Sequence, residues 1–158
     1  MKKIIVILFV SLALLNVTYG QTAAKAAYVE IGGPGLLSAN FDMRFTNKEN
    51  GIGFRVGVGA FSISGISVFT VPLGLNYLIG KKNNFFEIGA GYTYMNANAT
   101  LKSKSKNFNT SFGNATIGYR YAPAKGGFFF KAELTPIFGS GFTIPYFGGL
   151  GFGYKFKS

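Results

Sequence analysis

The chain has 158 residues and a formal net charge of +11 at pH 7, and it contains 23 glycines, 18 phenylalanines and 9 tyrosines. It has no cysteine and no histidine, which excludes disulfides, zinc sites built on these residues and a Ser-His-Asp catalytic triad. The length suits one domain.

The N-terminal segment 1–20 has the pattern of a secretory signal peptide. Two lysines precede an apolar run over residues 4–15, and Thr18 and Gly20 supply the small residues of a cleavage site. The apolar run is too short to span a membrane as a helix, which needs about 20 apolar residues. We therefore expect export, with removal of 1–20 and a barrel domain formed by 21–158.

Clusters of glycine, proline, asparagine, lysine and serine divide the rest of the chain into eight segments. Most of them reach the length of about 9–11 residues that a membrane-spanning β-strand needs. We predict strands at 26–33, 36–46, 52–62, 67–79, 84–96, 108–121, 127–138 and 144–156.

Within these segments apolar and polar residues alternate. In 67–79, for example, Leu73 and Leu75 share one face, and Gly74 and Asn76 share the other. A period of two indicates a β-strand with two unlike faces. An apolar face opposite a glycine-rich polar face suits a strand between lipid and the crowded interior of a small barrel. The pattern predicts an all-β fold, an eight-stranded antiparallel up-and-down transmembrane β-barrel in the outer membrane of a Gram-negative bacterium.

A soluble exported β-barrel that binds a ligand is the alternative, because such barrels also alternate, with the apolar face turned inward. The outer surface of a soluble barrel would be rich in lysine, glutamate and threonine. The polar face here is rich in glycine instead, which favours the membrane barrel.

Charged residues occur in the predicted strands on the polar face. In a narrow lumen each would be costly unless paired, so we expect an interior ion-pair network. It could plug the lumen and fix the strand register, or it could form the selectivity filter of a narrow, porin-like channel for ions or very small solutes. The candidate members are Glu30, Asp42, Arg44, Arg55, Glu87, Arg120, Lys131, Glu133 and Lys155.

A second candidate site is a basic hairpin near 97–106, where Lys102, Lys104 and Lys106 alternate with other residues. If exposed, these lysines could bind an anionic partner such as lipopolysaccharide phosphates. We favour the alternative, in which they protect a solvated strand edge from aggregation. The chain carries no nucleic-acid-binding motif, so we expect no nucleic-acid partner.

Four sequence segments support a resemblance to a known family: Gly-Gly-Pro-Gly-Leu-Leu-Ser at 32–38, Val-Pro-Leu-Gly-Leu-Asn-Tyr at 71–77, Phe-Glu-Ile-Gly-Ala-Gly at 86–91, and Gly-Leu-Gly-Phe-Gly-Tyr-Lys-Phe at 149–156. With them the chain resembles small outer-membrane β-barrel proteins of Bacteroidetes-type bacteria and, more distantly, the eight-stranded OmpA and OmpX barrels.

The resemblance implies a non-enzymatic protein with a structural or surface-interaction role and no cofactor. It also implies a monomer whose partners are outer-membrane lipids and the outer-membrane assembly machinery.

Overall fold

The alternating segments form ten β-strands in the computed structural model, which describes residues 23–63, 65–101 and 104–158. The strands are β1 (Lys25–Gly32), β2 (Leu37–Arg44), β3 (Gly51–Ile63), β4 (Ile66–Lys81), β5 (Asn84–Leu101), β6 (Lys104–Tyr121), β7 (Gly127–Leu134), β8 (Ile137–Gly139), β9 (Phe142–Ile144) and β10 (Gly148–Lys155).

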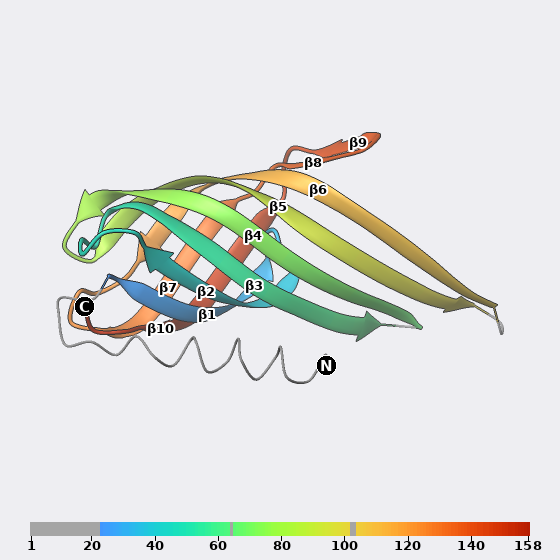
Figure 1. The fold of residues 1–158 in the computed structure, drawn as a ribbon, viewed down its shortest axis with the longest axis horizontal. Helices are drawn as coiled ribbons and strands as arrows, with labels where there is room; N and C mark the ends of the chain where they lie inside the picture. Colours follow the sequence, from blue (N-terminus) through green and yellow to red (C-terminus); the bar gives the residue numbers. More distant parts are fainter. Residues whose placement is uncertain (1–22, 64, 102–103) are drawn as a thin grey trace, which may run out of the picture.

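Eight of these strands close into an antiparallel barrel (Figure 1). Sequential neighbours pair from β1 to β7, β7 pairs with β10, and β10 returns to β1 with Tyr28 opposite Gly153. Closure removes the free edges of an open sheet around the body of the barrel, whereas the far ends of β3 and β6 extend past their neighbours on one side. The eight-stranded antiparallel barrel predicted from the alternation is thus confirmed. No helix in the described ranges is long and apolar enough to cross a membrane.

The two faces of the wall lie as the alternation predicts. Leu73, Leu75 and Tyr77 point outward and are 51%, 55% and 49% exposed, whereas Thr70 and Asn76 point inward and are buried. An exposed belt of aliphatic and aromatic side chains would be unstable in water but is what a hydrocarbon environment requires. The inverted arrangement of a soluble barrel is therefore wrong for this chain.

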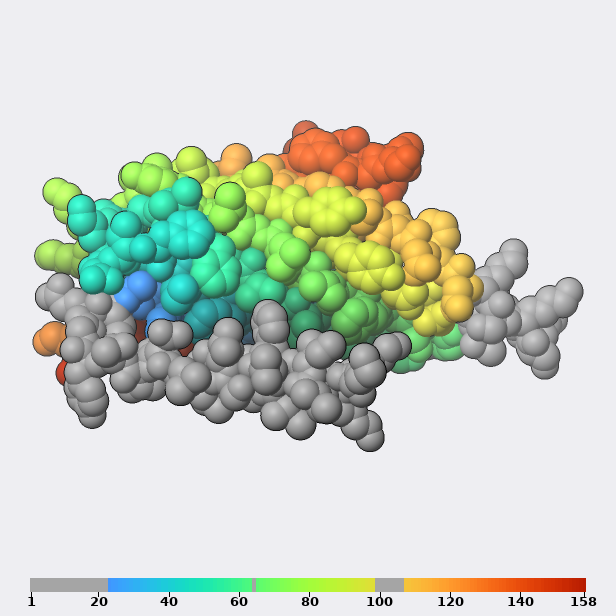
Figure 2. Space-filling model, in the orientation of Figure 1, coloured from blue at the N-terminus to red at the C-terminus, as the bar shows by residue number. Residues whose placement is uncertain are grey.

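The seventh and eighth strands are shorter than predicted. β7 ends at Leu134, not at residue 138, and β10 begins at Gly148, not at residue 144. Between them β8 and β9 form a hairpin that pairs with β6, at Phe112 opposite Gly139, and Figure 2 shows it standing out from the barrel body. Pro136 precedes β8 and cannot donate a ladder hydrogen bond, although its carbonyl accepts one from the Ala115 amide (3.1 Å).

The barrel wall has unequal height. β3 to β6 have 13, 16, 18 and 18 residues, whereas β1, β2, β7 and β10 have 8 each. The long strands extend past the short ones at the end away from the C-terminus (Figure 1). Outer-membrane barrels have short turns on the periplasmic side and longer structures outside. The tall wall therefore projects from the extracellular surface.

Candidate functional site

The charged side chains of the polar face meet inside the barrel, and Arg120 links two acids there. Its guanidinium group donates to Asp42 (2.8 and 3.0 Å) and to Glu87 (2.8 Å). Arg44 donates to the same Asp42 (2.7 Å). Each of these side chains is at most 2% exposed, so the cluster is desolvated and depends on its internal pairing.

Lys131 extends the cluster toward the other side of the lumen. Its ammonium nitrogen lies 3.3 Å from Glu87, 2.5 Å from Glu133 and 3.8 Å from Glu30. Arg55 lies 3.4 Å from Glu30 and 3.3 Å from Glu133. Four acids and four bases thus form one connected cluster in which the formal charges cancel.

The structure brings together eight of the nine candidate network residues. Lys155 was expected to join them but does not. It is buried near the C-terminal end of the lumen, and its ammonium group pairs with Glu49 (3.2 Å). The reason is its position at the last residue of β10, beside the β2–β3 turn. Of the basic hairpin, Lys102 lies outside the described residues, and Lys104 and Lys106 lie on β6.

Asn76 is a member of the cluster that sequence reasoning did not single out. Its amide nitrogen donates to Asp42 (2.5 Å) and to Glu87 (3.1 Å), and its amide oxygen accepts from Arg44. The amide thus lies between two carboxylates and donates a hydrogen bond to each of them. Asn76 lies on the polar face of the predicted strand 67–79, and this position already indicated that its side chain points into the lumen.

Two aromatic rings also lie inside the barrel, where only polar side chains were expected. Tyr28 and Phe129 stack with ring centroids 4.8 Å apart, and Phe129 has no exposed surface. The Arg120 guanidinium carbon lies 5.2 Å from the centre of the Phe129 ring, within cation–π range. Phe129 lies on the same strand face as Lys131, so the alternation already indicated that its ring points into the lumen.

The turn between β1 and β2 folds into the barrel above the charged cluster. The carbonyl of Pro34 accepts a hydrogen bond from the Thr93 hydroxyl (3.0 Å), and that of Gly35 accepts one from Thr70 (2.8 Å). Gly33 has φ +63°, which glycine adopts without steric cost, and a Cβ there would lie 2.8 Å from the Glu30 carboxylate. We call residues 33–36 the inward turn; with the cluster, it fills the lumen.

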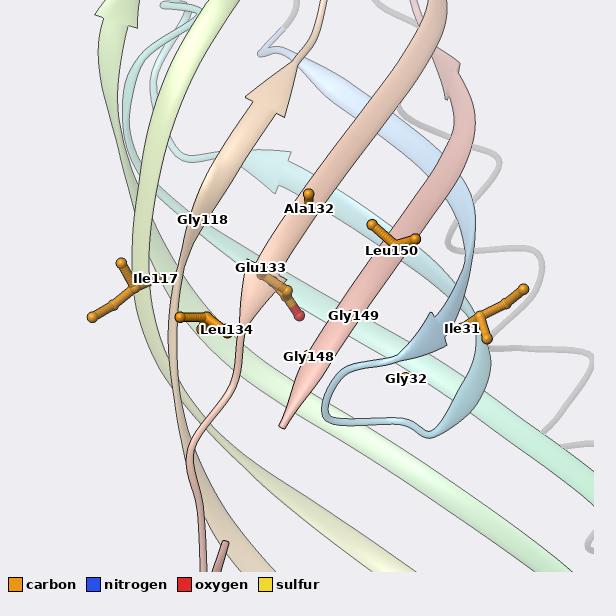
Figure 3. A pocket seen from close by; sticks show the side chains of 10 residues that line it. All are labelled: Ile31, Gly32, Ile117, Gly118, Ala132, Glu133, Leu134, Gly148, Gly149 and Leu150. Carbon is orange, nitrogen blue, oxygen red and sulfur yellow. The ribbon is translucent and has the colours of Figure 1, made fainter. Parts of the chain in front are cut away.

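A lipid-facing groove lies on the outer surface of the barrel, where β1, β6, β7 and β10 form the wall (Figure 3). Its volume is about 620 Å³. The lining includes four glycines among aliphatic side chains, and we call this feature the rim groove: Ile31, Gly32, Ile117, Gly118, Ala132, Glu133, Leu134, Gly148, Gly149 and Leu150.

The closed barrel, its apolar outer belt and its charge-filled lumen define an integral outer-membrane β-barrel. The chain is similar in structure to the N-terminal β-barrel domain of Pseudomonas aeruginosa OprF, with 16% identity and a TM-score of 0.65 over 85% of this chain and 96% of that domain. It is also similar to Neisserial surface protein A, with 14% identity and a TM-score of 0.52 over 86% of this chain and 94% of that one. No protein-family model matches the sequence, and no curated protein sequence matches it significantly.

Proposed function

We propose that this barrel is non-enzymatic and serves a structural or surface-interaction role through its extracellular sheet, not through its lumen. The observation that carries the proposal is the filled lumen. Eight paired charged side chains cross it, and the inward turn lies above them. A cavity at the periplasmic end of the lumen has a volume of about 10 Å³, no more than one water molecule needs.

The competing function is a narrow channel, and planar-bilayer conductance tests it. We expect the folded protein to give no discrete single-channel steps, because an ion would have to displace desolvated, mutually paired charges. Lys125→Gln, which changes an exposed turn, is the control and should also be silent. Reproducible steps whose cation selectivity changes in Lys131→Met would identify the lumen as a conducting path and contradict the proposal.

We further propose that the hairpin bearing Lys102, Lys104 and Lys106 contacts the phosphates of lipopolysaccharide. Each lysine close to an anionic membrane surface contributes about 1 kcal/mol, so replacing all three by glutamine should weaken binding at low salt. The matched control replaces three exposed lysines at the periplasmic end of the barrel, Lys48, Lys81 and Lys82. Titration against lipopolysaccharide vesicles at several salt concentrations is the measurement; equal affinity and salt dependence in both variants would leave these lysines only a solvating role.

Three related expectations complete the proposal: the barrel is a monomer, its other partners are membrane lipids and the assembly machinery, and its relatives are small barrels of Bacteroidetes-type bacteria. Closure of the barrel within one chain supports the first, because the barrel body needs no second copy to complete its backbone hydrogen bonds. The last rests on the sequence segments described above and stays a prediction.

A further inference from the structure

We propose that the inward face of the projecting part of the wall binds an acyl chain of lipopolysaccharide. This part, which we call the projecting sheet, extends past the short strands (Figure 1) and comprises residues 60–63 of β3, 66–69 of β4, 95–101 of β5 and 104–111 of β6. The inference rests on the proposed contact between the hairpin lysines and lipopolysaccharide phosphates, and it adds the apolar part of the same ligand.

The two faces of the wall exchange their polarity where the projecting sheet begins. In the barrel body the outward face is apolar, as at Leu73, and the inward face is polar, as at Thr70. In the projecting sheet one row of paired residues on the outward face is polar throughout: Ser62, Ser67, Asn98 and Asn107. The adjacent row, on the inward face, is apolar throughout: Phe61, Val68, Ala97 and Phe108. Because a strand turns successive side chains to opposite faces, this exchange marks the level at which the outward face leaves hydrocarbon and meets water.

The outward face of the projecting sheet is suited to water and forms its own hydrogen bonds. The hydroxyl oxygens of Ser62 and Ser67 lie 2.9 Å apart. The Asn98 amide nitrogen donates to the Asn96 amide oxygen (3.1 Å), and the Asn96 amide nitrogen donates to Asn109. The outward side of this sheet is therefore not a continuation of the lipid-facing belt.

The inward face has the opposite character and lacks a cover in the described part of the chain. Phe108, Ile63 and Ile66 are 61%, 66% and 46% exposed. The short wall does not reach them, because the pairing of β2 with β3 stops at Gly59. Contiguous exposed apolar surface above the membrane marks an interaction site, so a ligand with a hydrocarbon part fits this face.

The charge of the projecting sheet indicates which hydrocarbon ligand. The sheet contains no acidic residue, and its far end carries Lys104 and Lys106, which pair with Leu101 and Ala99 through the backbone. Phe108 follows Lys106 by two residues, about 7 Å along a strand. Basic positions at the tip and apolar positions below them match a ligand whose anionic groups stand above its acyl chains. Lipopolysaccharide in the outer leaflet has this order, with its phosphates outward and its acyl chains beneath them.

Tryptophan fluorescence tests the proposal, because the chain has no tryptophan of its own. Phe108→Trp places a single tryptophan on the inward face, and the matched control, Asn107→Trp, places it on the outward face of the same strand. Each full-length barrel is folded into phosphatidylcholine vesicles, and intact or fully deacylated lipopolysaccharide is added. We expect intact lipopolysaccharide to shift the Phe108→Trp emission to shorter wavelength and to leave the Asn107→Trp emission unchanged. Deacylated lipopolysaccharide, which keeps the phosphates, should shift neither.

Binding measurements separate the acyl-chain contact from the phosphate contact. Ile63→Ser combined with Phe108→Ser should weaken the affinity for intact lipopolysaccharide about tenfold, equivalent to about 1.4 kcal/mol, and leave that for the deacylated form unchanged. The matched control, Ser62→Ala combined with Asn107→Ala, changes the neighbouring positions on the other face and should bind like the wild type. All four side chains are exposed, so folding should persist, which heat-modifiable migration on a gel verifies. Replacing the three hairpin lysines by glutamine should weaken the binding of both ligands.

Three outcomes would overturn the proposal. Phe108→Trp emission that is already at short wavelength without lipopolysaccharide would mean that phospholipid covers the face. A shift that grows with barrel density in vesicles without lipopolysaccharide would assign the face to a second copy of this chain. No shift with intact lipopolysaccharide, together with weaker binding of the lysine variant, would leave the phosphate contact in place without a bound acyl chain. By contrast, a persistent Phe108→Trp shift with unchanged binding of the lysine variant would support the acyl-chain site and contradict only the phosphate contact.

Discussion

Replacing Arg120 by leucine is expected to lower the free energy of unfolding by about 3 to 5 kcal/mol, the usual cost of removing one partner from a buried ion pair. Arg120 is the only base within hydrogen-bonding distance of both Asp42 and Glu87 in the described part of the chain. Its loss leaves Asp42 with Arg44 and Asn76 alone, and the lumen keeps four acids against three bases.

Urea titration in lipid vesicles, followed by heat-modifiable migration, measures this loss. Lys125→Leu is the control for removing one positive charge, because Lys125 is exposed in the β6–β7 turn, and surface changes of this kind alter stability little. The double variant Glu87→Gln with Arg120→Leu should recover part of the loss, because it restores the charge balance of the lumen while Arg44 keeps Asp42 and Lys131 keeps Glu133. An Arg120→Leu protein as stable as Lys125→Leu would mean that the cluster does not hold the barrel together.

Replacing Phe129 by alanine is expected to cost about 3 to 5 kcal/mol, the range for truncating a buried phenylalanine. The ring has no exposed surface and packs between Tyr28 and the Arg120 guanidinium group. Its removal would leave a void inside a closed wall that can collapse only slightly, and it would deprive Arg120 of one neighbour.

The adjacent Phe128 supplies a matched control for this substitution. It is 60% exposed on the lipid-facing side, where lipid chains can fill the space that alanine leaves. Phe128→Ala should therefore cost clearly less than Phe129→Ala in the same urea titration. Equal losses for the two variants would contradict the placement of Phe129 inside the lumen.

The alternation of residue types was enough to predict the eight barrel strands and their two faces, although not where β7 and β10 meet the β8–β9 hairpin. A β-strand turns successive side chains to opposite sides whatever it pairs with, so the alternation of Leu73 and Leu75 with Gly74 and Asn76 already separated lipid from lumen. The same rule placed nine charged residues inside, and all nine are buried. It also held for Phe129, whose strand face is that of Lys131.

Which of those residues meet depends on how the strands are arranged in space. Asp42 and Arg120 are 78 positions apart, and their contact depends on the stagger of strands around the closed barrel, which no local pattern encodes. The inward fold of the 33–36 turn likewise depends on contacts with distant strands. The same holds for the pairing of Lys155 with Glu49. The ladder along β6 is interrupted at Thr135 and Pro136, after which β8 still pairs with β6, whereas β9 pairs with β8. A strand's pattern fixes its faces, but its neighbours fix where it ends.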